Sequence, residues 1–170
     1  MKEEGIKFNC NWIEAPAPAD ASIHELNEWR NKLYGLGLIG ETADGIGYGN
    51  ISRRLAGNTF IITGATTGKL PQLSNQHYTT VTDYNIGENR LTTGGPIKAS
   101  SESLTHAMIY ECDDQVQAVF HVHHKALWQY LLKELPSTDS KVPYGTPEMA
   151  AEIARLCREA SLRDHKILAM

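Results

Sequence analysis

Two histidines separated by one residue, His121 and His123, are the side chains of this sequence best suited to metal chemistry. The segment Val116–His123 alternates as a β-strand does, and alternate residues of a strand share a face. The two imidazoles would then stand about 6.6 Å apart at their bases, close enough to bind one ion. An accidental pair at a strand end is one alternative. A structural zinc clip is another, although two nitrogens without a nearby thiolate leave a four-ligand site incomplete.

Ser100-Ser101-Glu102 is the second candidate, at the start of a predicted helix that continues to Glu111. Either serine can cap this helix, which places Glu102 in its first turn. A helix N-terminus offers unpaired N–H groups and a positive dipole end, which can hold a phosphate or a carboxylate. Glu102 has a plainer interpretation, a surface acid that complements the dipole. Beside a cation and an anion pocket, the same carboxylate can transfer protons.

Two turns that contain glycine, Gly49-Asn50 and Thr63-Gly64, lie at the ends of predicted strands. Glycine lets the backbone approach a ligand closely at such places. Turn formation alone is also sufficient to explain both. His106 follows Glu102 by one helical turn, and we interpret it as a helix histidine with satisfied hydrogen bonds rather than as a ligand.

The periodicity of the chain predicts one domain at residues 21–170 after an N-terminal arm at residues 1–20 that ends in alternating Ala and Pro. A capping box at Ser22-x-x-Glu25 begins a helix that the glycines at 35 and 37 end. Two more helices are predicted, at His124–Leu135 and, after the capping residue Thr146, at Pro147–Ala160. Further strands are predicted at Asn50–Leu55, Thr59–Thr63, Tyr78–Tyr84 and Arg90–Thr93, and one begins within His165–Met170.

Composition excludes several classes of protein. The 170 residues carry 16 Lys+Arg against 20 Asp+Glu, a formal charge of −4, so no bulk attraction to nucleic acid or anionic lipid is expected. No apolar run approaches the roughly 20 residues that span a bilayer, and acids stand where a signal peptide would be apolar, so we expect a cytoplasmic protein. Three widely spaced cysteines, Cys10, Cys112 and Cys157, are expected to be reduced.

Taken together and in order, four landmarks resemble the class II aldolase/adducin family: Gly49-Asn50-Ile51-Ser52, Thr63-Gly64, Ser100-Ser101-Glu102 and His121-x-His123. The resemblance extends from about Ile23 to Met170. It implies an α/β fold, a three-layer α/β/α sandwich around a largely antiparallel central sheet. It also implies assembly as a homo-oligomer, commonly a cyclic tetramer.

The resemblance further implies a lyase that acts on a hydroxy-ketone sugar phosphate or a similar anionic carbohydrate, by aldol cleavage, epimerisation or dehydration. It assigns Zn²⁺ or another divalent ion to His121 and His123, and the acid/base role to Glu102. The anion pocket would be lined by Asn50, Thr63, Gly64, Ser100 and Ser101. Because the adducin head belongs to the same family, a non-enzymatic interaction domain is the alternative.

One expected ligand has no counterpart in the sequence. Enzymes of the family supply a third metal-binding histidine just after the strand that Ile167–Met170 resembles, and this sequence ends at Met170. We therefore expect a domain that lacks its C-terminal segment. His165 precedes that strand and is the alternative third ligand.

Overall fold

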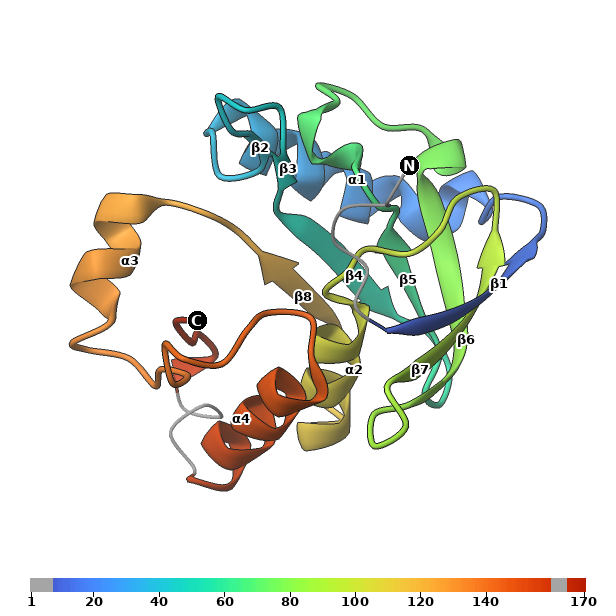
Figure 1. The fold of residues 1–170 in the computed structure, drawn as a ribbon. Helices are drawn as coiled ribbons and strands as arrows, with labels where there is room; N and C mark the ends of the chain where they lie inside the picture. Colours follow the sequence, from blue (N-terminus) through green and yellow to red (C-terminus); the bar gives the residue numbers. More distant parts are fainter. Residues whose placement is uncertain (1–7, 160–164) are drawn as a thin grey trace.

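The strands form a mixed sheet in the computed structural model, which describes residues 8–159 and 165–170 (Figure 1). Six strands in this part of the chain form the sheet in the order β1-β7-β6-β5-β4-β8. Only β1 and β7 pair in parallel, and every other neighbouring pair is antiparallel. Their bounds are β1 Asn9–Glu14, β4 Asn50–Arg54, β5 Phe60–Thr63, β6 Tyr78–Asn85, β7 Arg90–Gly95 and β8 Ala118–His121.

Helices and a small hairpin complete the fold. The helices are α1 Asp20–Gly35, α2 Ser103–Cys112, α3 Lys125–Leu131 and α4 Pro147–Arg158, with short 3₁₀ turns η1 Thr67–Lys69 and η2 Asn75–His77. The hairpin joins β2 Gly40–Glu41 to β3 Gly47–Tyr48. In the described residues, no helix has both the length and the apolar character needed to cross a bilayer.

The sheet is covered by helices on both faces, and β5 shows why. All four of its residues are buried, as expected for a central strand. Ile61 packs with residues of α1, including Leu26, whereas Phe60 and Ile62 pack with Leu104 and other residues of α2. Since successive side chains of a strand point to opposite faces, this alternation defines two helical layers around one sheet. The predicted three-layer α/β/α fold is therefore confirmed.

Helix ends agree less well with the sequence prediction. Helix α1 begins at Asp20 and Ala19 provides no side-chain cap, so the predicted capping box at Ser22 is wrong. The start of α4 is confirmed: the Thr146 hydroxyl accepts a hydrogen bond from the Met149 amide. The predicted end of this helix, at Ala160, lies outside the described residues.

Two predicted elements near the C-terminus differ in the structure. The predicted helix at His124–Leu135 is reduced to α3 at Lys125–Leu131. The predicted strand near Met170 is wrong, because Ala169 forms only one isolated parallel bridge, to Ser137.

A disulfide between Cys112 and Cys157 corrects the prediction that these cysteines are reduced. It joins the last residue of α2 to α4, and the two helices also pack against each other (Figure 1). The two residues are 45 positions apart, and no short motif links them. Only the packing of α4 on α2 brings them together.

The disulfide is expected to stabilise the folded protein, because closing a loop of this length restricts the unfolded chain. Replacing Cys112 by serine should lower the free energy of unfolding by about 2–4 kcal/mol. Urea unfolding with and without a reductant measures the effect. A Cys10→Ser variant is the control, and its stability should still depend on the reductant. Equal stability of the oxidised and reduced wild-type protein would contradict the prediction.

Candidate metal and acid-base site

Strands β4 and β8 bring Asn50 and His121 together. The two residues are direct partners in the antiparallel pair, so their side chains share one face of the sheet. The Asn50 Nδ2 atom lies 3.4 Å from Nδ1 of His121. Gly49 makes this approach possible: its φ is +78°, and a Cβ there would lie 2.7 Å from Cγ1 of Ile39 and 3.2 Å from the carbonyl oxygen of His121.

The two histidines of the H-x-H motif face each other. Nε2 of His121 lies 3.1 Å from Nε2 of His123, and the ring centroids are 4.9 Å apart. Strand β8 ends at His121, so the predicted strand to residue 123 is too long. His123 is instead held by its amide, which donates to the Leu38 carbonyl (2.9 Å), and by its ring, which stacks on Tyr48 at 5.0 Å.

Both imidazoles are neutral near pH 7. Burial lowers the pKa of His121 to about 4. Loss of water around the ring, followed by the influence of His121, lowers the pKa of His123 to about 4, while Glu102 acts in the opposite direction. Neutral imidazole nitrogens are the form that binds metal ions.

The spacing of the two Nε2 atoms fits a shared cation. Two nitrogens bound tetrahedrally to one ion at about 2.05 Å stand about 3.3 Å apart, close to the observed separation. In the described part of the chain, no third His, Cys, Asp or Glu joins them in a metal-binding group. The pair could therefore provide two positions of a coordination shell, with the others left open.

Glu102 lies at the N-terminal end of α2 and is only 3% exposed. It occupies the capping position rather than the first turn, and neither Ser100 nor Ser101 is the cap, which corrects the predicted helix start. The Thr105 hydroxyl donates to its carboxylate (3.0 Å). Because Glu102 raises the pKa of His123, the carboxylate lies within electrostatic reach of that imidazole.

The predicted anion-binding residues adjoin Glu102 through the backbone. The Ser100 amide donates to the Thr63 carbonyl (3.3 Å), and Gly64 forms a bridge with Ala99. The Thr63 hydroxyl lies 3.2 Å from the Ile51 amide that donates to it, so it serves to join β5 to β4. Ser100 is buried and Ser101 half-buried, in the turn that leads to Glu102.

Arg30 is a residue that the sequence analysis did not assign to the site. It lies in α1, is 1% exposed, and donates from Nη2 to the carbonyls of Thr67 (3.0 Å) and Gly68 (3.1 Å). It therefore supports the turn that follows Gly64. The only sequence signal was a charged residue within the apolar stripe of a helix.

A buried network lies beneath the histidine pair, on the α2 face of β4. Nδ1 of His106 lies 2.7 Å from the Ser52 hydroxyl, which lies 2.7 Å from the Tyr110 hydroxyl. The other ring nitrogen of His106, Nε2, is buried and has no hydrogen-bond partner among the described residues. The prediction that His106 is a satisfied helix histidine thus holds for one nitrogen only.

His106 should make stability depend on pH. Burial, followed by the influence of His121, lowers its pKa to about 3. The unfolded chain therefore binds a proton near pH 6.5 that the folded chain binds only near pH 3. Stability should fall as the pH drops through this range, by about 1.4 kcal/mol per pH unit for this one proton.

Urea unfolding of the His106→Gln variant between pH 7 and pH 5 tests this pH dependence. In the variant, the free energy of unfolding should change less steeply with pH, by the amount that one proton contributes. The His24→Gln variant, which removes a histidine with an exposed side chain, should keep the wild-type pH dependence. Equal slopes for wild type and His106→Gln would contradict the assignment.

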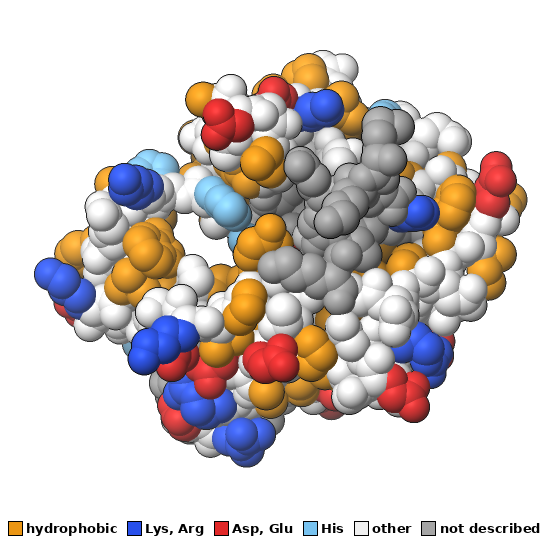
Figure 2. Space-filling view, in the orientation of Figure 1, with side chains coloured by type: hydrophobic (Ala, Val, Ile, Leu, Met, Phe, Trp, Pro, Cys, Tyr) orange, Lys and Arg blue, Asp and Glu red, His pale blue; other side chains and the backbone are white. Residues whose placement is uncertain are grey.

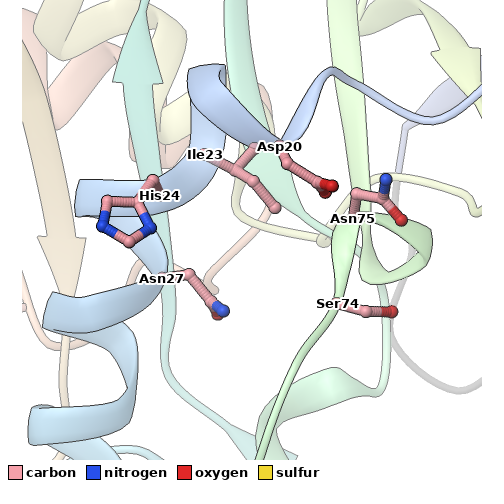
Figure 3. Close-up of a pocket in the computed structure, with 6 residues that line it drawn as sticks. All are labelled: Asp20, Ile23, His24, Asn27, Ser74 and Asn75. Atoms are coloured by element: carbon pink, nitrogen blue, oxygen red, sulfur yellow. The ribbon is translucent and has the colours of Figure 1, made fainter.

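A shallow pocket of about 190 Å³ lies elsewhere, between the start of α1 and η2 (Figure 3). It is lined by Asp20, Ile23, His24, Asn27, Ser74 and Asn75. None of the candidate site residues borders it. Within it, both ends of the Asn27 amide are engaged, with the Leu73 carbonyl and the Tyr78 hydroxyl, so the pocket adds no group to the chemistry above.

Comparison with known proteins finds one matching family and solved structures with a similar fold. The family model "Class II Aldolase and Adducin N-terminal domain" matches residues 35–165. YgbL of Klebsiella pneumoniae, described as a candidate aldolase, epimerase or decarboxylase, superposes with a TM-score of 0.57 at 18% identity. YgbL of Escherichia coli superposes with a TM-score of 0.56 at 21% identity. Both superpositions cover 81% of this chain and 70% of the other.

A search of the curated proteins finds no match. At these identities the two structures establish the common fold, and the family model covers most of the chain. The chain belongs to the class II aldolase and adducin family.

Proposed function

We propose that this chain is a divalent-metal-dependent lyase of the class II aldolase type. Its substrate would be a hydroxy-ketone sugar phosphate or a similar anionic carbohydrate. The observation that carries the proposal is the facing pair of Nε2 atoms, with the buried carboxylate of Glu102 within electrostatic reach of His123. Membership of the family adds support, and so does the likeness to the two YgbL structures.

His121 and His123 would hold Zn²⁺ or another divalent ion through Nε2. When bound, the ion supplies Lewis acidity at the oxygens of the hydroxy-ketone. The remaining chemistry falls to the protein. Glu102 itself is buried, and this burial would limit the access of water to its carboxylate, the group proposed for proton transfer.

Glu102 would hold and move the proton. In aldol cleavage a hydroxyl group loses a proton as the carbon–carbon bond breaks, and the carbon left behind gains one. A carboxylate in reach of both positions can serve each step in turn. Epimerisation by cleavage and rejoining, or dehydration, requires the same kind of proton transfer from the same group.

The anionic end of the substrate would be bound by the segments around Asn50, Thr63, Gly64, Ser100 and Ser101. These segments adjoin through the main-chain contacts of Thr63 with Ser100 and of Gly64 with Ala99. The Thr63 hydroxyl accepts from β4 and its carbonyl accepts from Ser100, so this residue would shape the pocket, and the donors would come from its neighbours. Main-chain amides and serine hydroxyls are suitable donors to a phosphate or a carboxylate.

Assembly into a homo-oligomer, such as a tetramer, is part of the proposal. Apolar side chains are exposed on α3 and at the adjoining end of β8, where Figure 2 shows hydrophobic atoms at the surface. They are Phe120, Val122, Leu127, Trp128 and Tyr130. Exposed apolar side chains beside an outer strand fit contact with a second copy of the chain. Light scattering of the purified protein measures the assembly.

The decisive experiment is metal analysis of the purified protein, followed by a screen for aldol cleavage of ketose phosphates and related sugar acids. We expect a bound or bindable divalent ion, and cleavage that a chelator abolishes and added metal restores. A protein that takes up no divalent ion would refute the proposal. It would favour the adducin-like alternative, in which the domain binds partners without catalysis.

A further inference from the structure

One polar atom beside the histidine pair has no partner. The amide oxygen of Asn50, Oδ1, is buried and makes no hydrogen bond with any described residue. The residue is 7% exposed, so water does not readily replace the missing donor. A buried acceptor left unpaired costs about 1–3 kcal/mol. Such a position is uncommon unless the atom has a use.

The other end of the same amide, its nitrogen, faces His121 as a hydrogen-bond donor, whereas a metal-binding His121 needs an acceptor at that position. Nδ2 of Asn50 is a donor and lies 3.4 Å from Nδ1 of His121. Nε2 of His121 is turned toward His123. A neutral imidazole carries one proton, so an Nε2 atom that binds a metal requires the proton on Nδ1. That N–H group needs an acceptor, and Asn50 is its sole hydrogen-bond partner among the described residues.

Rotation of the amide by 180° resolves the mismatch at His121, and it leaves the amide nitrogen in the position that now holds the unpartnered oxygen. It exchanges the oxygen and the nitrogen of the side chain with almost no change in its shape. The unpartnered oxygen then accepts from Nδ1–H of His121. Since cross-strand pairing already sets the two side chains against each other, no movement of the backbone is needed.

We propose that Asn50 is a positioning residue whose amide oxygen accepts from Nδ1–H of His121 and so directs the free Nε2 lone pair toward the metal position. This inference rests on the proposed function and deepens it. Asn50 would thereby orient His121, a metal-binding side chain, in addition to bordering the anion site. Ligating histidines generally require such an acceptor on their second nitrogen.

The inference also fixes the state of His123 in the metal-free protein. The 3.1 Å contact between the two Nε2 atoms needs one donor. With His121 held as the acceptor, His123 must donate from Nε2–H. His121 is then prepared for a metal ion, whereas His123 has to move its proton to Nδ1 when the ion binds.

The test measures the histidine tautomers in the metal-free protein by ¹⁵N NMR. Wild type should show His121 protonated at Nδ1 and His123 protonated at Nε2. Asn50→Asp offers an oxygen in either orientation and should preserve this pattern. Asn50→Leu removes the acceptor, so the population of His121 that carries its proton on Nδ1 should decrease. Thr79→Val, which removes a buried unpartnered hydroxyl from β6, is the control and should leave the tautomers unchanged.

Zinc and cobalt titrations provide the second measurement. Asn50→Leu should bind metal about 10–100-fold more weakly than wild type, and Asn50→Asp should bind within a few-fold of it. Metal-free wild type with His121 protonated at Nε2 would overturn the inference, and this result needs no variant to fold. An Asn50→Leu protein with unchanged tautomers would also overturn it. If the tautomers respond as expected but no metal binds, the role of Asn50 stands and the proposed function fails.

Discussion

Replacing either His121 or His123 by alanine is expected to weaken divalent-metal binding by about 100–1000-fold. Zinc sites with four ligands bind with about 10–16 kcal/mol, so each ligand accounts for about 3–4 kcal/mol. Each substitution removes one of the two facing Nε2 atoms and leaves a single imidazole at the site. Because both rings are neutral near pH 7, no repulsion between charges is relieved that would offset the loss.

His124→Ala is the matched control for these two variants. His124 is adjacent in sequence, but it caps α3, where its Nδ1 accepts from the Leu127 amide (3.1 Å). Its loss should cost about 1 kcal/mol of stability and leave metal affinity unchanged. Calorimetric titration with Zn²⁺, and the visible spectrum of the Co²⁺ form, compare the three variants. If His121→Ala and His124→Ala bind metal equally well, the histidine pair is not the metal site.

Local patterns were sufficient to predict the central strands and the start of α4. The strand from Asn50 is bounded by Gly49, and Thr146-Pro147 combines a cap with a first-turn proline. These signals act over a few residues and do not depend on the rest of the fold. Strand β1 was missed for the opposite reason: its partner β7 begins about eighty residues later, so its pairing has no local signature.

The residues of the candidate site also fall into two groups: those that a local sequence pattern predicts and those that depend on contacts between distant segments. The H-x-H motif and Glu102 were found because their types and spacing are unusual in a short segment. Their actual arrangement depends on distant contacts, since His123 leaves the strand and is held by Leu38 and Tyr48. Arg30 and the Cys112–Cys157 disulfide depend on packing between elements, which no short pattern encodes.

Glu102→Gln is expected to reduce turnover by about 100–10,000-fold while metal binding is retained, because a single positioned acid/base contributes that much to catalysis. The substitution is nearly isosteric, and its amide oxygen can still accept from the Thr105 hydroxyl, so the start of α2 should remain intact. The amide cannot take up a proton near pH 7, so only proton transfer is removed.

Glu111→Gln is the control for Glu102→Gln, since it removes an exposed glutamate from the same helix and should leave turnover unchanged. Steady-state kinetics on the substrate found in the cleavage screen, with metal content determined for each variant, separates the two effects. A loss in kcat with unchanged metal content would identify Glu102 as the proton-transfer group. A Glu102→Gln protein that turns over within a few-fold of wild type would show that another group moves the proton, and the proximity of this carboxylate to His123 would then be structural.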